Sequence, residues 1–66
     1  MFVTINGKPS EVKDGSTLAD LLDHLEIKRE FVAVELNMDI VPKSFYDSRT
    51  LTAGDVIEIV QFVGGG

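Results

Sequence analysis

Hydrophobic residues recur along this chain at two spacings, which predicts a fold that combines strands with a helix. Short β-branched and aromatic runs, which favour strands, occupy residues 2–5, 31–36 and 56–63. The first run is followed by Asn6 and Gly7, a strong hairpin signal because both residues tolerate positive φ. We expect the return strand over 10–13, with Pro9 in the loop or at the sheet edge.

A helical spacing is found in residues 16–27. Leucines fall at i, i+3, i+4 and i+7, which places on one helix face Leu18, Leu21, Leu22 and Leu25. Ser16 or Thr17 can cap the start of the helix, and Thr17 with Asp20 forms an approximate capping box, with Asp in place of the usual Glu or Gln. We predict a helix with a buried leucine stripe and a solvent-facing acidic side.

The segment after residue 36 predicts a turn and a short return strand. Asn37, Met38 and Asp39 form the turn, and residues 40–42 form a piece that Pro42 confines to a sheet edge. Because Met rarely adopts positive φ, we expect Asn37 or Asp39 to take that conformation.

An aromatic pair lies outside the main strands. It belongs to residues 44–48, which predict a turn or a single helical turn, and a brief strand is expected at 50–51. A domain of this size needs aromatic volume in its core, and we assign that role to Phe45. Tyr46 would then be a candidate for an exposed ring.

The last run, residues 56–63, is apolar at alternating positions on both sides except at Glu58 and Gln61. This pattern is typical of a strand in the middle of a sheet. Hairpin, crossover helix and central last strand together predict an α+β fold of the β-grasp, or ubiquitin-like, type, with four to five strands in a mixed sheet and one main helix across it. We expect one domain over 1–63 and a flexible glycine tail over 64–66.

Composition and charge exclude several classes of function. The chain has 66 residues, no cysteine and a net charge of −5. Disulfides, thiolate metal sites and a cysteine nucleophile are therefore excluded, and an acidic surface disfavours nucleic acid. The start "MFVTING" lacks the features of a secretory signal, and no apolar run approaches the roughly 20 residues that span a bilayer, so we expect a cytoplasmic protein without membrane contact.

Catalytic residues are not indicated inside the domain. The single histidine, His24, lies off the leucine stripe without a partner, and Asp20, Asp23 and Glu26 fit a solvated helix face. Phosphate-binding glycine motifs are absent. The serines lack a histidine–acid partner set: Ser16, Ser44 and Ser48. We expect no enzyme activity, no metal and no bound cofactor.

The glycines at 64–66 are the remaining candidate for chemistry. A frayed end is the plain reading, but these residues directly extend a predicted central strand. Without Cβ atoms they could enter a channel too narrow for other residues. The carboxylate of Gly66 would be ionised and a poor electrophile, so it would need activation, for which an acyl-adenylate made from ATP is suited. The chemistry would then take place on Gly66.

The chain resembles the ThiS family, the sulfur carriers of thiamin biosynthesis. The resemblance rests on "ING", "TLADLLDHL", "VAVELN" with "IVPK", "GDVIEIVQFV" and the "GGG" end. It implies that an adenylyltransferase related to ubiquitin-activating enzymes uses Mg-ATP to adenylate Gly66. A persulfide from a cysteine desulfurase or another sulfur donor then yields a thiocarboxylate for thiazole synthase. Gly65 and Gly64 would serve in tail recognition, and Val63 and Phe62 in partner docking.

Three alternatives remain open from the sequence. A sister sulfur carrier, such as the small subunit of molybdopterin synthase, would share the fold and the glycine end. A ubiquitin-like modifier would begin with the same adenylate and end in a bond to a lysine. A non-covalent interaction module would leave the glycines idle.

Overall fold

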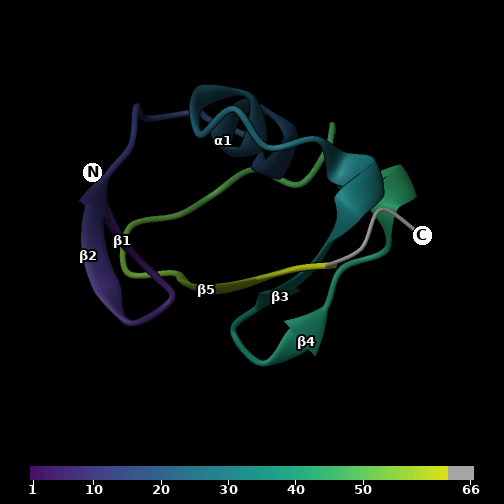
Figure 1. Cartoon of the computed structure of the whole chain (residues 1–66). Helices are drawn as coiled ribbons and strands as arrows, with labels where there is room; N and C mark the ends of the chain where they lie inside the picture. Colours follow the sequence, from purple (N-terminus) through teal and green to yellow (C-terminus); the bar gives the residue numbers. More distant parts are fainter. Residues whose placement is uncertain (63–66) are drawn as a thin grey trace.

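The computed structural model describes residues 1–62, which form a mixed sheet with one α-helix across one face (Figure 1). The strands are β1 (Phe2–Ile5), β2 (Lys8–Glu11), β3 (Val32–Leu36), β4 (Asp39–Ile40) and β5 (Val56–Gln61). The helix α1 spans Leu18–His24, and two 3-10 helices are η1 (Arg29–Phe31) and η2 (Lys43–Phe45). The predicted tail over 64–66 and residue 63 lie outside the described residues.

The sheet has the order β2-β1-β5-β3-β4, with β1 and β5 parallel and the other pairs antiparallel. This is the predicted β-grasp fold, and the predicted central position of the last strand is confirmed. The return strand β2 begins at Lys8 and includes Pro9, which an edge strand tolerates. Instead of a brief strand at 50–51, the structure has a single bridge between Thr50 and Thr17.

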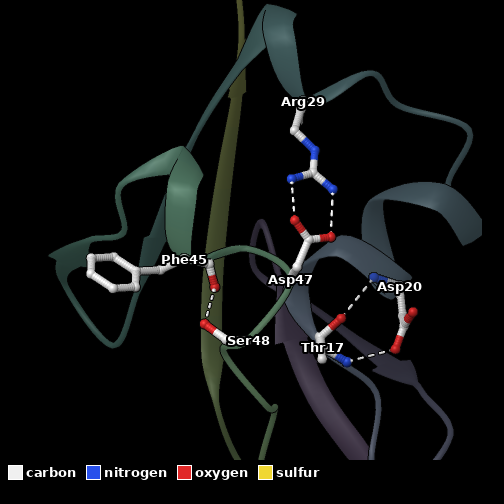
Figure 2. Close-up of polar contacts among 6 residues, drawn as sticks. All are labelled: Thr17, Asp20, Arg29, Phe45, Asp47 and Ser48. Atoms are coloured by element: carbon white, nitrogen blue, oxygen red, sulfur yellow. Dashed lines mark hydrogen bonds and ion pairs between the residues drawn. The ribbon is translucent and has the colours of Figure 1, made fainter.

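The helix α1 begins with the predicted capping box. The Thr17 hydroxyl accepts from the Asp20 backbone N–H at 3.1 Å, and the Asp20 carboxylate accepts from the Thr17 N–H at 2.9 Å (Figure 2). Leu18, Leu21 and Leu22 are buried, but Leu25 is 39% exposed. The leucine stripe ends early because the helix ends at His24 and Leu25 is its C-cap.

The core lies between α1 and one face of the sheet. Its buried members are Val3, Leu18, Ala19, Leu21, Leu22, Val32, Val34, Leu36, Tyr46, Leu51, Ile57 and Ile59. The helix supplies the upper layer of this core, and alternating residues of β1, β3 and β5 supply the lower one. The domain is therefore a two-layer structure.

The assignment of Phe45 to the core was wrong. Tyr46 is 1% exposed and Phe45 is 54% exposed. Neighbouring side chains of a 3-10 turn point about 120° apart, so only one of the two rings can face inward. The Tyr46 carbonyl accepts from the Ala19 N–H at 2.9 Å, which fixes Tyr46 beneath the start of α1. Burial raises the pKa of Tyr46, and a hydrogen bond with the Val34 backbone partly offsets this.

Both hairpins use two-residue turns with positive φ. Asn6 and Gly7 have φ of 49° and 82°, as predicted, and Asn37 and Met38 have φ of 53° and 74°. The expectation that Asn37 or Asp39 would take positive φ is confirmed at Asn37, but the expectation that Met38 would avoid it was wrong. The Asn37 side-chain oxygen accepts from the Val56 N–H at 2.9 Å, which ties the turn to β5. Positive φ at both central positions is the pattern of a type I′ turn, which imposes this conformation on its second residue, Met38.

Replacing Met38 with glycine is expected to stabilise the domain by about 0.5–1 kcal/mol, because glycine adopts positive φ without the Cβ penalty. The Met38 side chain is 85% exposed, so little packing is lost. Thermal unfolding would show a rise in Tm of about 4–8 °C per kcal/mol for a domain of this size. Met38→Ala is the matched control, since it keeps the Cβ atom. An equal gain in both variants would contradict backbone strain as the cause.

Candidate functional site

The end of β5 carries the chain toward the predicted functional glycines. Gln61 pairs with Val32, and the Phe62 N–H donates to the Phe31 carbonyl at 2.8 Å. The backbone is therefore held against the start of β3 as far as Phe62 (Figure 1). Of the predicted site residues, Phe62 is described, whereas Val63, Gly64, Gly65 and Gly66 lie outside the described residues.

The Phe62 ring is 54% exposed and has two kinds of neighbour. The Lys43 ammonium lies 5.6 Å from the ring centroid and donates to the Val32 carbonyl at 2.7 Å. The ring also borders a shallow hollow, whose lining residues are Glu26, Ile27, Lys28, Phe31, Gln61 and Phe62. The last described residue thus offers an apolar edge next to fixed positive charge.

The outer face of β5 exposes apolar side chains on both sides of Glu58. Ile57 and Ile59 face the core, whereas Val56, Val60 and Phe62 are 42%, 57% and 54% exposed. The apolar residues on the two sides of β5 therefore have different surroundings. One face packs under the helix, and no other segment of residues 1–62 covers the opposite face. Apolar patches of this kind mark interaction surfaces.

Two carboxylates lie side by side on that outer face. Glu58 of β5 is the direct cross-strand neighbour of Glu35 of β3. Within residues 1–62 the two ion pairs are Met1 with Asp14 and Arg29 with Asp47, so neither glutamate is neutralised there. Like charges opposite each other on a sheet are unfavourable, which makes this part of the face attractive to a cation.

A bidentate ion pair joins η1 to the turn that follows η2. The Arg29 guanidinium donates to both oxygens of Asp47 at 2.8 and 2.9 Å (Figure 2). Figure 2 also shows the Ser48 hydroxyl donating to the Phe45 carbonyl at 3.3 Å, which closes the turn after η2. The hydrogen bonds from Arg29 hold the pKa of the Asp47 carboxyl below its ordinary value, against a smaller effect of desolvation.

A model of the ThiS family matches residues 3–66. The chain belongs to the ThiS family. It is 44% identical to the sulfur carrier protein ThiS of Bacillus subtilis, with 98% of this chain and 100% of that protein covered. The crystal structure of the thiamine biosynthesis protein ThiS from Geobacter metallireducens has a TM-score of 0.85 and 38% identity, with both chains fully covered.

Longer proteins also contain a ThiS-like segment. The thiazole synthase of Paramagnetospirillum magneticum is 42% identical to this chain over 66 residues. The chain spans 20% of the length of the thiazole synthase relatives that it matches. ThiS-like sequence thus occurs in relatives of two lengths.

Other candidate residues of this ThiS-family chain are dispersed. His24 is exposed at the end of α1, as predicted, and Asp20, Asp23 and Glu26 are exposed as well. Within residues 1–62 no group of three or more His, Cys, Asp or Glu side chains is arranged to hold a metal ion. None of the helices in that range is long and apolar enough to cross a membrane.

Sequence reasoning missed Lys43. The lysine is separated from Phe62 by 18 intervening residues, and no periodic pattern links the two positions. Its position directly after Pro42, which confines the preceding piece of chain to a sheet edge, was the one available signal.

The Arg29–Asp47 pair predicts a specific pH dependence. Because the pKa of Asp47 is lowered in the folded state, its contribution to stability is present above the unfolded pKa and lost as the pH falls through the folded pKa. The difference in Tm between wild type and Asp47→Asn should therefore be constant above about pH 5 and shrink below about pH 4. Asp39→Asn is the control, because Asp39 has no ion pair within residues 1–62. An Asp47→Asn difference that grows in acid would contradict the assignment.

Proposed function

We propose that this ThiS-family protein is a sulfur carrier of thiamin biosynthesis and a co-substrate of partner enzymes, without catalytic activity of its own. The observation that carries the proposal is the similarity to the Bacillus subtilis sulfur carrier protein ThiS along that protein's whole length. The fold supports it, because the central strand β5 leads directly toward Gly66.

The first step activates the carboxylate of Gly66. One carboxylate oxygen attacks the α-phosphorus of Mg-ATP held by a ubiquitin-activating-like adenylyltransferase, and pyrophosphate leaves. In the acyl-adenylate, AMP is a good leaving group, whereas the free carboxylate has no good leaving group. The partner supplies the metal and the charge stabilisation, which suits a carrier whose own acids and histidine are dispersed over its surface.

The second step exchanges oxygen for sulfur. The terminal sulfur of a persulfide, formed on a cysteine desulfurase or another donor, attacks the acyl carbon and displaces AMP. A thiol then cleaves the resulting acyl disulfide and is itself oxidised to a disulfide, which releases the thiocarboxylate on Gly66. This chain has no cysteine, so every thiol that takes part in these reaction steps belongs to a partner protein or to another thiol compound.

Thiazole synthase is the proposed acceptor of the sulfur. A segment similar to this chain within proteins named thiazole synthase supports this assignment. In the proposed transfer, the nucleophilic thiocarboxylate sulfur attacks an electrophilic carbon of the thiazole precursor, which links the precursor to Gly66 through a thioester. Water then cleaves the acyl–sulfur bond, so the sulfur stays on the precursor and the carboxylate of Gly66 is regenerated. Gly64 and Gly65 are the proposed recognition segment, because a glycine backbone fits a narrow channel.

Docking is proposed to use the outer face of the sheet. Val56, Val60 and Phe62 supply the apolar area, and the net charge of −5 favours a partner with a basic rim. The neighbouring Glu35 and Glu58 would receive one cationic side chain of that partner. Charges at such a rim raise the encounter rate more than the final affinity.

Mass spectrometry of the intact protein and of its C-terminal peptide tests the proposal. After incubation with ATP, the adenylyltransferase and a sulfur donor, the expected result is one oxygen-for-sulfur exchange on the peptide that contains Gly66. Oxidation of Met1 or Met38 changes the mass by almost the same amount as this exchange. The mass change must therefore be localised to the C-terminal peptide. Alkylation by a thiol reagent adds a second signature, because the unmodified chain has no cysteine. Heavier protein adducts in place of this exchange would indicate a modifier.

A further inference from the structure

Lys43 connects three segments at the end of the sheet that leads to Gly66. It is the first residue of η2, it donates to the carbonyl of Val32 at the start of β3, and it lies over the ring of Phe62 directly after β5. The two contacts measure 2.7 Å from Nζ to the carbonyl oxygen and 5.6 Å from Nζ to the ring centroid. One ammonium group therefore touches both the neighbouring strand and the final described residue.

The Val32 carbonyl is available because the ladder between β3 and β4 stops short of it. The Val41 N–H still donates to the Val34 carbonyl at 3.0 Å. Continuing the same register would place the N–H of Lys43 opposite the Val32 carbonyl, but the chain turns at Pro42 into η2. The side chain of Lys43 thus supplies the donor that a longer strand would have supplied from its backbone.

The Lys43 ammonium is held in one place. No carboxylate competes for it within residues 1–62, where the ion pairs involve Met1 and Arg29 instead. A hydrogen bond from a charged donor is roughly twice as strong as a neutral one, and a cation over an aromatic face adds a further attraction. The hydrogen bond to Val32 therefore keeps the ammonium group in place over the ring of Phe62.

Phe62 is fixed from two sides. Its N–H is bound to the Phe31 carbonyl at 2.8 Å, and its ring lies under the Lys43 ammonium. Four residues follow Phe62 in the sequence. Four fully extended residues span at most about 14 Å, so the place and direction of Phe62 set the region that Gly66 can reach.

We propose that Lys43 is a positioning residue for sulfur transfer, which holds Phe62 so that the Gly66 carboxylate is directed toward the active site of the adenylyltransferase. This inference rests on the proposed function. Loss of the contact would release Phe62, which is the described residue nearest to Gly66 along the chain. The effective concentration of the carboxylate at the partner's active site would fall as a result.

The contact itself is tested by NMR on the isolated protein. In Lys43→Met the amide exchange of Phe62 is expected to increase about threefold to tenfold, its heteronuclear NOE to fall and its ring resonances to shift. Lys43→Arg, which keeps a cationic donor, should restore most of the wild-type values. Lys28→Met is the matched control, since Lys28 lines the hollow beside Phe62 and its loss changes the net charge equally. Unchanged Phe62 signals in Lys43→Met would overturn the inference.

The consequence for transfer is tested by ATP–pyrophosphate exchange with the adenylyltransferase and Mg-ATP. In Lys43→Met the KM for the carrier is expected to rise roughly threefold to tenfold with a smaller change in kcat, while Lys43→Arg and Lys28→Met stay near wild type. Equal losses in Lys43→Met and Lys28→Met would indicate a general effect of charge and overturn the positioning role. Wild-type kinetics in Lys43→Met would do the same. A failure of the proposed function can be distinguished from these outcomes. In that case the wild-type protein would not support ATP–pyrophosphate exchange, while the NMR differences between wild type and Lys43→Met would persist.

Discussion

Deletion of Gly66 is expected to reduce sulfur loading by at least about 100-fold while the melting temperature stays unchanged. The deletion moves the terminal carboxylate back by one residue, roughly 3.3–3.6 Å, and a misplacement of about 1 Å at a reacting centre can already cost a factor of about 100. We expect the domain to keep its stability, because the described core and strand ladders are built from residues 1–62. The measurements are C-terminal-peptide mass spectrometry after ATP-dependent loading, and thermal unfolding.

Two further variants distinguish the effect of the length of the C-terminal segment from the effect of an added side chain. Gly65→Leu keeps the length and the terminal carboxylate but adds a side chain, so it should also lose loading if Gly65 enters a narrow channel. Gly66→Ala keeps the length and adds one methyl group, and it should retain more activity than either. If the protein without Gly66 still supports thiazole synthesis, the glycines are idle and the carrier proposal is refuted.

Truncation of Tyr46 to alanine is expected to destabilise the domain by about 3–5 kcal/mol, the cost of removing a large aromatic side chain from a core. Tyr46 is 1% exposed and closes the space beneath the start of α1. A 66-residue domain has a total stability of roughly 3–10 kcal/mol, so this single change removes a large part of it. Thermal and denaturant unfolding should show a protein that is at best marginally folded at 25 °C.

Phe45→Ala is the matched control for this prediction. Phe45 is the adjacent aromatic residue and is 54% exposed, so its truncation should cost less than about 1 kcal/mol. Tyr46→Phe is a second comparison, since it keeps the ring and removes the hydroxyl. Equal destabilisation by Phe45→Ala and Tyr46→Ala would contradict the packing observed here.

The features that the sequence predicted correctly depend on neighbours along the chain. The capping box of Thr17 and Asp20 needs residues three apart, and the hairpin at Asn6 and Gly7 needs two residues that accept positive φ. The apolar run at 56–63 predicted a central strand, because its composition is unfavourable at an edge. Local conformational preferences and hydrophobic periodicity are properties of short segments, which is why they could be read directly.

The features that the sequence did not predict depend on contacts between segments far apart in the chain. The need for aromatic volume led us to assign Phe45 to the core, but the direction of the 3-10 turn and the bond to α1 placed Tyr46 there. The strain at Met38 arises because Asn37 is bonded to β5 across the sheet.

By itself the sequence determined the β-grasp elements, the central last strand and the family resemblance, including the proposed role of Gly66. Only the tertiary structure decided which aromatic ring is buried, which face of β5 is open, and that Lys43 lies over Phe62. The physical reason is that the free energies behind the first group arise within a few consecutive residues. Those behind the second group exist only after strands and turns far apart in the chain have packed together.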